Sequence, residues 1–175
     1  MRCRSPGADH EDVGELELRV AGLDHPDVTP LMRRLQAFYG EVYGDGDATP
    51  VDPADFRTPS GLFLVGYDDG VPVATGAWRA VDADPADPAR RDGDAELKRM
   101  YVEPAARGRG HARAVLVALE RAAAAAGRRR MILETGDGQP AAIALYETSG
   151  YRRTSNFGAY RNDPRSRCFA KPLPA

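Results

Sequence analysis

Along most of the chain, apolar residues recur with a period that predicts a strand or a helix. Residues 15–20 alternate leucine and valine with charged side chains, which is typical of a half-buried strand. Over residues 25–44 apolar positions recur every three or four residues, which predicts a helix of about three turns. We expect Thr29 as its N-cap and Pro30 in its first turn, with an apolar stripe made of Leu31, Leu35, Phe38 and Val42.

The rest of the chain continues as strands and helices separated by polar turns. Two apolar runs within residues 62–81 are separated by an Asp-Asp-Gly turn, a strong hairpin signal. A helix after Gly110 carries an apolar stripe that includes Val115, Leu116 and Leu119. The other predicted elements are strands over 96–102, 130–136, 151–157 and 166–173 and a helix over 139–149.

This order of elements predicts a mixed α/β (α+β) sheet in one domain. The chain of 175 residues is long enough to bury one core. Residues 1–14 are polar and interrupted by proline and glycine, so we expect a flexible N-terminal tail followed by one domain over 15–175.

The charge of the chain argues against two classes of partner. Its 24 basic and 26 acidic residues give a net charge of -2, so no global field attracts nucleic acid or a membrane surface. The basic run Arg128–Arg130 is best explained as a solvated turn. No apolar run approaches the roughly 18 residues of a membrane helix, and no signal peptide is evident. We expect a cytoplasmic protein.

Neither the cysteines nor the acidic loops suggest a metal site. Cys3 and Cys168 match no metal-ligand spacing, and a reduced chain is the simplest interpretation, with a disulfide left open. The loop over residues 82–95 is rich in aspartate and proline but lacks calcium-loop spacing, so we interpret it as a solvated hairpin end.

A turn over residues 107–112, Arg-Gly-Arg-Gly-His-Ala, stands between a predicted strand and a predicted helix. Glycines at a rigid helix N-terminus leave backbone N–H groups accessible to an anion, which predicts a phosphate site. The alternative is a tight turn with solvated arginines. A dinucleotide-binding loop would need glycine where Arg113 stands, and no Gly-Lys-Ser/Thr of a Walker A loop occurs.

The same turn reads R-x-x-G-x-A, which resembles the acetyl-CoA pyrophosphate loop of the GNAT superfamily of N-acetyltransferases. Residues 96–127 resemble the central strand, loop and helix of that family, and "AAIALYETSGYRR" resembles its later helix and strand. The resemblance covers nearly the whole chain and extends to a bacterial branch whose substrate is unassigned. It implies the GNAT fold: a single mixed, mostly antiparallel sheet of six to seven strands, flanked by about four helices and splayed at the central strands.

The resemblance also implies acetyl-CoA as co-substrate and assigns the residues that bind it. Backbone N–H groups of the turn would hold the pyrophosphate, and the strand edge before it would pair with the pantetheine amides. Gln139 stands where many members have an asparagine that touches pantetheine. The implied cofactor-binding residues are Met100, Tyr101, Val102, Arg107, Gly108, Arg109, Gly110, His111, Ala112 and Gln139. The side chain of His111 is either a phosphate contact or solvated.

Glu96 matches a glutamate that takes the proton of the acceptor amine in many family members. A base is needed because an alkylamine with a pKa of about 10.4 is neutral about one time in a thousand at pH 7. Strand alternation would place Glu96 on one face with Lys98, Met100 and Val102. The alternative is a solvent-facing glutamate paired with Lys98 or Arg79.

Tyr146 matches the tyrosine that donates a proton to the departing thiolate in this family. The alternative is a core tyrosine at the junction of helix and sheet. An acid and a base together are consistent with direct attack, without a covalent enzyme intermediate. Cys168 could be an acyl carrier, but no histidine lies near it in sequence, which favours a buried apolar cysteine.

The sequence therefore predicts an N-acetyltransferase that acts on the primary amine of a small molecule. A protein N-terminal or lysine acetyltransferase, or an acyl-CoA-binding module without turnover, is the alternative, and a homodimer is left open. Aromatic residues in segments that border the acceptor side of this family are candidates for its pocket: Tyr39, Tyr43, Trp78, Phe157 and Tyr160.

Overall fold

The computed structural model describes residues 16–47, 49 and 51–174, which form seven strands, three α-helices and two short 3₁₀ turns. The predicted tail, residues 1–14, lies outside the described residues. In chain order the elements are β1 (Glu17–Val20), α1 (Val28–Tyr43), η1 (Pro53–Phe56), β2 (Gly61–Asp68), β3 (Val71–Val81), β4 (Asp94–Val102), η2 (Pro104–Ala106), α2 (His111–Ala125), β5 (Arg130–Gly136), α3 (Pro140–Thr148), β6 (Arg152–Arg153) and β7 (Ser166–Pro172).

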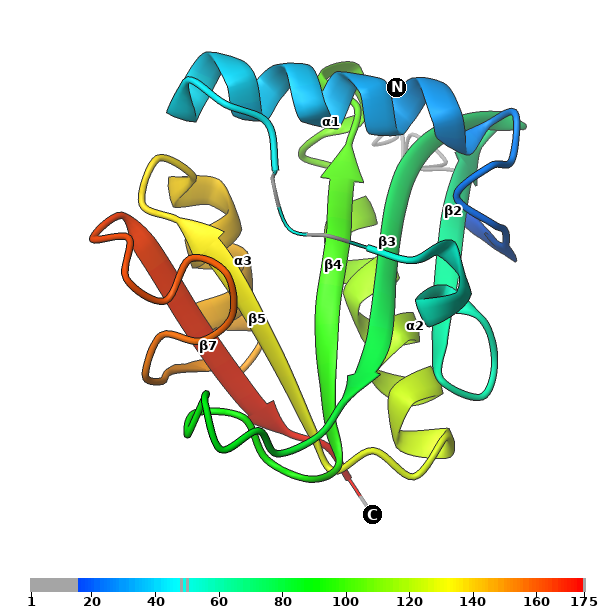
Figure 1. Ribbon diagram of the computed structural model, residues 1–175. Coiled ribbons are helices and arrows are strands. Elements are labelled where there is room, and N and C mark those ends of the chain that lie inside the picture. Colours follow the sequence, from blue (N-terminus) through cyan, green and yellow to red (C-terminus); the bar gives the residue numbers. More distant parts are fainter. Residues whose placement is uncertain (1–15, 48, 50, 175) are drawn as a thin grey trace, which may run out of the picture.

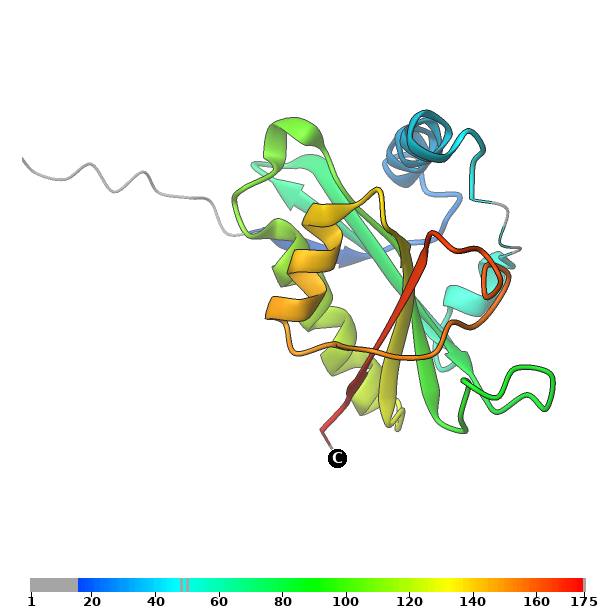
Figure 2. The same ribbon diagram turned by 90° about the vertical axis from the view of Figure 1, so that its left-hand side faces the viewer.

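The strands form one mixed sheet in the order β1-β2-β3-β4-β5-β7-β6. Helix α1 covers one face of this sheet, and α2 and α3 cover the other (Figures 1 and 2). The pairs are antiparallel except that of β4 with β5, which is parallel. This architecture confirms the predicted fold class. Among the described residues, no helix has the length and apolar character needed to span a bilayer.

The sheet opens between its two central strands. β4 and β5 pair only at their beginnings, where residues 94–96 face residues 130–132. Beyond Glu96 the strands diverge, with β4 running to Val102 and β5 to Gly136 (Figure 1). The expected splay of the central strands is therefore present, and it leaves the edge of β4 beyond Glu96 without a strand partner on that side.

Each face of the sheet has its own hydrophobic core. On the α2 face, the predicted stripe of Val115, Leu116 and Leu119 is fully buried and packs with Leu97. On the α1 face, Leu31 and Leu35 pack on residues of β2 to β4 such as Phe63 and Tyr101. Burial of such side chains contributes about 1.5–3 kcal/mol each. These two cores hold α2 and the first half of α1 on opposite faces of the sheet, and the second half of α1 extends along the opening.

A β-bulge in β4 changes the faces predicted for that strand. Between the pairs Thr75–Tyr101 and Ala77–Lys98, two residues of β4 lie opposite one residue of β3. Arg99 has a positive φ of 57°, and its carbonyl accepts a hydrogen bond of 2.9 Å from the hydroxyl of Thr75. Met100 and Val102 accordingly pack on the α2 side, with Leu97. The expectation that both share a face with Glu96 was wrong, because the bulge shifts the alternation by one residue.

Near the N-terminus, helix α1 is longer than predicted and begins one residue before Thr29. Asp27 occupies the N-cap position without a side-chain cap, while the Thr29 hydroxyl donates back to the carbonyl of His25 at 3.2 Å. Val42 is 38% exposed and Val20 on the edge strand β1 is 70% exposed, so neither belongs to the core that the pattern suggested.

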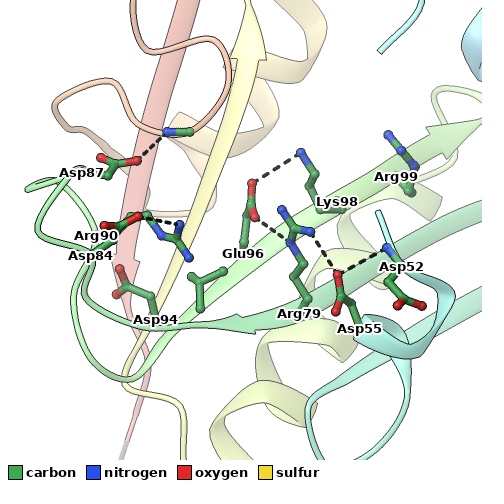
Figure 3. Close-up of polar contacts among 12 residues, drawn as sticks. Asp52, Asp55, Arg79, Asp84, Asp87, Arg90, Asp94, Glu96, Lys98 and Arg99 are labelled. Carbon is green, nitrogen blue, oxygen red and sulfur yellow. Dashed lines mark hydrogen bonds and ion pairs between the residues drawn. The ribbon is translucent and has the colours of Figure 1, made fainter. Parts of the chain in front are cut away.

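The acidic loop and the basic run meet at the closed end of the sheet. Asp94 is fully buried at the start of β4, and Arg130 donates to both of its carboxylate oxygens at 2.7 and 2.6 Å. Arg128 donates to the carbonyls of Val81 and Asp94. Asp87 is buried and accepts from the N–H of the loop residue Gly158 at 2.7 Å (Figure 3). The prediction of two solvated turns was wrong for these four side chains, because connections distant in sequence pack side by side, whereas other charged residues of the two segments are exposed as expected.

Candidate active site

A cleft of about 920 Å³ occupies the opening between β4 and β5. Its walls come from the second half of α1, the segment after it, β4 beyond Glu96, the turn before α2, the end of β5, α3 and the loop before β7. The cleft therefore passes from the α2 and α3 face of the sheet to the α1 face. The part near the turn before α2 is called here the cofactor end, and the part near α1 and the loop before β7 the acceptor end.

At the cofactor end, the unpaired edge of β4 and the turn before α2 lie in succession. Met100, Tyr101 and Val102 line the cleft, and so do all residues of the turn over 107–112 except Arg109. Gly108 and Gly110 have φ values of 81° and 83°, a conformation that favours glycine. A Cβ at either position would meet no atom within 4 Å, so the glycines are needed for the backbone angle and not for space.

The N-terminus of α2 has no side-chain cap. Gly110 is its N-cap residue and has no side chain with which to accept from the first N–H groups of the helix. Those N–H groups, together with the helix dipole, form a site suited to an anion. The geometry thus fits the phosphate site inferred from the turn.

Two side chains of the turn contact Asp68, at the end of β2. Arg109 forms an ion pair with the Asp68 carboxylate. His111 is buried, and its Nε2 lies 3.4 Å from the same carboxylate. Arg107 bends back so that its Nε donates to the carbonyl of Val102 at 3.0 Å. These contacts fix the conformation of the turn, which leaves its backbone groups as the anion-facing part.

Tyr146 on α3 lines the cleft and is 6% exposed. Its ring packs against Tyr151 and Phe169, with centroid distances of 5.7 and 6.3 Å. Burial, and secondly the nearby charge of Glu134, raises the pKa of the Tyr146 phenol. Tyr146 is therefore a neutral phenol over the physiological pH range, a form that can donate a proton.

Gln139 is the N-cap residue of α3 and links the two ends of the cleft. Its amide Nε2 donates to the hydroxyl of Tyr43 on α1 at 3.1 Å. Gly136, at the end of β5, leaves room for the same phenol, because a Cβ there would overlap the Tyr43 ring. The side-chain amide of Gln139 is thus held by a residue of α1.

Glu96 is not among the residues that line the cleft. Its carboxylate accepts from Arg79 Nε at 2.9 Å and lies 3.4 Å from the ammonium of Lys98 (Figure 3). Arg79 also reaches Asp55 at 3.2 Å. Glu96 thus has both partners named in the alternative to a base, but it is only 7% exposed, so the expectation that a paired Glu96 would face solvent was wrong. Lys98, its partner, does line the cleft.

A second glutamate, Glu134 on β5, lies in the cleft. The hydroxyl of Ser166 donates to its carboxylate at 3.2 Å. Burial raises the pKa of Glu134, and the carboxylates of Asp47 and Glu96 add to that effect. A carboxylate with a raised pKa in a cleft is a candidate general base. Sequence reasoning missed Glu134, although a single acidic residue inside the apolar strand "RMILETG" was a usable signal.

Three of the five aromatic candidates line the acceptor end of the cleft: Tyr39, Tyr43 and Tyr160. Trp78 is 1% exposed and belongs to the core under α2, and Phe157 is 2% exposed in a small core with Ile132 and Cys168. Neither residue lines the cleft, because its position on the strand or loop directs its side chain into a hydrophobic core.

Asp47 ties the segment after α1 across the acceptor end. It forms an ion pair with Arg99, the bulge residue of β4, and accepts from the Tyr160 hydroxyl at 3.2 Å. Burial opposes ionisation of Asp47, but Lys98, the N–H of Thr49 and Arg99 hold its pKa below the usual value. Asp47 is therefore a charged link between α1, β4 and the loop before β7.

Comparisons with known proteins agree on one family. The family model described as the acetyltransferase (GNAT) family matches residues 28–151. The chain belongs to the GNAT family. It is 36% identical over 146 residues to an IAA acetyltransferase of Azospirillum brasilense, which covers 83% of this chain and 90% of that protein.

Solved structures resemble this GNAT acetyltransferase over most of its length. A Klebsiella pneumoniae protein assigned to the acyl-CoA N-acyltransferases superposes with a TM-score of 0.71 at 28% identity, covering 90% of this chain and 97% of the other. The PaiA N-acetyltransferase of Thermoplasma acidophilum, solved in complex with coenzyme A, has a TM-score of 0.66 at 13% identity and covers 90% and 99%. The second likeness concerns the fold alone.

These matches confirm the predicted resemblance. The protein is an acyltransferase of a family that uses acetyl-CoA. Within the described part of this GNAT chain, no group of three histidine, cysteine or acidic side chains could hold a metal ion. Cys168 is a fully buried free thiol whose pKa is raised by burial, as expected for an apolar cysteine, while Cys3 lies outside the described residues.

Proposed function

We propose that this GNAT acyltransferase transfers the acetyl group of acetyl-CoA to a primary amine of a small molecule by direct attack. The observation that carries the proposal is one continuous cleft, in which an uncapped helix N-terminus lies at one end and a carboxylate with a raised pKa at the other. Tyr146 lines the same cleft.

The residues at the cofactor end fit coenzyme A by the chemistry of their groups. Backbone N–H groups at residues 108–112 would hold the pyrophosphate, because they are uncapped and the helix dipole favours negative charge there. The unpaired edge of β4 at Met100–Val102 offers peptide groups to the pantetheine amides. Gln139 keeps its side-chain oxygen for the same arm while its nitrogen donates to Tyr43.

Acetyl-CoA, when bound, supplies an activated thioester. We assign Glu134 as the general base that accepts the proton of the acceptor ammonium, so that the neutral nitrogen can attack the thioester carbonyl carbon. As the carbon–sulfur bond breaks, Tyr146 donates its proton to the sulfur, and the second proton that the attacking nitrogen loses on forming the amide restores the Tyr146 phenol. Cys168 takes no part, since its thiol is fully buried outside the lining of the cleft.

The base role of Glu96 stays a prediction, and the geometry favours Glu134. Glu96 is held by Arg79 and Lys98 at the base of the opening. In that position it keeps Lys98 in place beside the cleft, and the positive charge of Lys98 lowers the pKa of Glu134 against the effect of burial. Glu96 would then act through Lys98 as a positioning residue.

A small acceptor is favoured over a peptide by the contacts that cross the acceptor end. Asp47 connects the segment after α1 to Arg99 and Tyr160, and Tyr43 connects α1 to Gln139. A peptide would need an open groove along this face, and these two bridges would have to break to provide it. A compact amine can occupy the space between them.

The test is release of free thiol from acetyl-CoA with a panel of small primary amines, compared with peptides that offer an N-terminal amine or a lysine. We expect turnover with small amines and at least about tenfold lower kcat/KM with peptides. Turnover with peptides alone would move the assignment to protein acetylation. Binding of acetyl-CoA by calorimetry without turnover on either panel would assign an acyl-CoA-binding module.

A further inference from the structure

We infer that the acceptor is an arylalkylamine, a primary amine carried on an aromatic body without a carboxylate. The inference rests on the proposed function and names the substrate class of the same cleft. It follows from two independent features of the acceptor end, its aromatic wall and the pairing of its charges.

The aromatic wall is formed by three residues of α1 and by Tyr160 from the loop before β7. Phe38, Tyr39 and Tyr43 form a chain of tilted rings, with centroid distances of 5.9 Å for the first pair and 6.4 Å for the second. All four residues line the cleft, and each keeps part of its surface exposed. Ring faces presented to a cleft bind another ring in offset or edge-to-face geometry.

The position of this wall is fixed before any acceptor arrives. Tyr43 accepts from Gln139, and the lack of a side chain at Gly136 lets its ring lie against the end of β5. Tyr160 donates to Asp47 at 3.2 Å. Rigid rings bind an aromatic body without the cost of ordering flexible side chains.

The cations of the acceptor end are already paired with carboxylates. Lys98 lies 3.4 Å from Glu96, and Arg99 pairs with Asp47. Arg165, at the rim, lies 3.0 Å from Asp163 and has its guanidinium 5.5 Å from the centre of the Tyr43 ring. A carboxylate on the acceptor would therefore compete with an anion already held by each of the two cations with mostly buried side chains, Lys98 and Arg99, which leaves only the exposed Arg165 at the rim.

Glu134 is the opposite case. Within residues 16–47, 49 and 51–174, no lysine, arginine or histidine lies within ion-pair distance of its carboxylate, which accepts a hydrogen bond from the Ser166 hydroxyl. An acceptor ammonium would form such a direct ion pair and place its proton on the group assigned as the base. The Glu134 carboxylate thus favours an acceptor with a positive charge, and the aromatic wall favours an acceptor with an aromatic ring.

The experiment measures kcat/KM for 2-phenylethylamine, hexylamine and phenylalanine with saturating acetyl-CoA. The three amines are similar in size. Comparison with hexylamine measures the effect of the aromatic ring, and comparison with phenylalanine measures the effect of a carboxylate. We expect 2-phenylethylamine to exceed each of the others by about tenfold or more, because ring contacts and a buried unpaired charge each change binding by such a factor.

Variants of the aromatic wall test whether it binds the ring, with 2-phenylethylamine and hexylamine compared in each variant. Tyr43→Leu and, as a second variant without a hydrogen bond to lose, Phe38→Leu should raise KM for 2-phenylethylamine about fivefold while changing it for hexylamine less than about twofold. The dissociation constant of acetyl-CoA, measured for each variant, shows whether the cofactor end remains intact.

Three outcomes would overturn the inference. Equal kcat/KM for hexylamine and 2-phenylethylamine would remove the ring site. A preference for phenylalanine that disappears in Arg165→Ala would show that Arg165 binds an acceptor carboxylate. Failure of every amine in the panel, with acetyl-CoA still bound, would overturn the proposed function itself and the inference with it.

Discussion

At the cofactor end of the cleft, the predicted groups come mainly from one continuous segment, residues 100–112, and are largely backbone groups. At the acceptor end, side chains converge from α1, the segment around Asp47, β4, β5 and the loop before β7. Under the proposed function, the first arrangement would bind the coenzyme A part of the substrate through backbone groups. The second depends on which side chains five separate segments bring together.

This difference explains what each end can tolerate. A substitution at the cofactor end matters when it changes backbone angles or blocks the anion, as at Gly110. A substitution at the acceptor end matters when it removes one side chain from a set, such as Glu134 beside Ser166. Variants at the two ends should therefore differ: those at residues 108–112 should change the binding of acetyl-CoA, and those around Glu134 should change turnover.

Gly110→Glu should abolish useful binding of acetyl-CoA. The substitution places a side chain at φ 83° and a carboxylate where the N–H groups of α2 would hold a pyrophosphate. Losing two such charge-assisted hydrogen bonds would cost about 4 kcal/mol, or about a thousandfold in Kd. Isothermal titration measures the loss.

The matched control is Gly127→Glu, just beyond the other end of the same helix. Gly127 has a φ of 78° and, like Gly110, no neighbour within 4 Å of an added Cβ. Both variants carry the same backbone strain, so equal loss of binding in the two would contradict an anion site at residues 108–112.

Glu134→Gln should lower kcat by about a hundredfold, because the acceptor amine loses its base. Binding of acetyl-CoA should stay within about twofold, since the substituted residue lies at the acceptor end. Glu96→Gln is the companion variant: it loosens Lys98 and should reduce kcat less than Glu134→Gln. A larger reduction of kcat in Glu96→Gln than in Glu134→Gln would assign the role of general base to Glu96.

Tyr146→Phe should lower kcat by about tenfold. The expected effect is smaller than for Glu134→Gln. A thiol has a pKa of about 8.5, so a thiolate can leave without a proton donor more easily than an alkylammonium can lose its proton without a base. The phenylalanine ring keeps the packing on Tyr151 and Phe169. Single-turnover rates at saturating acetyl-CoA give the measurement, and an unchanged rate would leave Tyr146 with a core role only.

The pH dependence should reveal Glu134 directly. Burial raises the pKa of Glu134, so kcat/KM should rise with pH through a value above that of an ordinary glutamate, because only the ionised carboxylate accepts a proton. This rise of kcat/KM with pH should be absent in Glu134→Gln, and its persistence there would assign the rise to another group.

The stability of the fold should change with pH in the opposite direction. The pKa of Glu134 is higher in the folded than in the unfolded chain, so its contribution to the free energy of unfolding falls as pH rises from the unfolded-state pKa through the folded-state pKa.

The order of elements, the glycine turn and the buried stripe of α2 could be predicted from the sequence because each is a property of neighbouring residues. The faces of β4 could not, since the bulge at Arg99 depends on two β4 residues lying opposite Gly76 in β3. Nor could the ion pairs of Asp94 with Arg130, which join two connections that are far apart along the chain.

The candidate site divides in the same way. The sequence by itself determined the uncapped start of α2, because Gly110 at its N-cap has no side chain to accept from the first N–H groups. Only the tertiary structure placed Glu96 between Arg79 and Lys98, brought Glu134 into the cleft, and set Trp78 in a core while Tyr43 faces the opening. Local backbone geometry is encoded in adjacent residues, whereas the surroundings of a side chain depend on which distant segments pack against it.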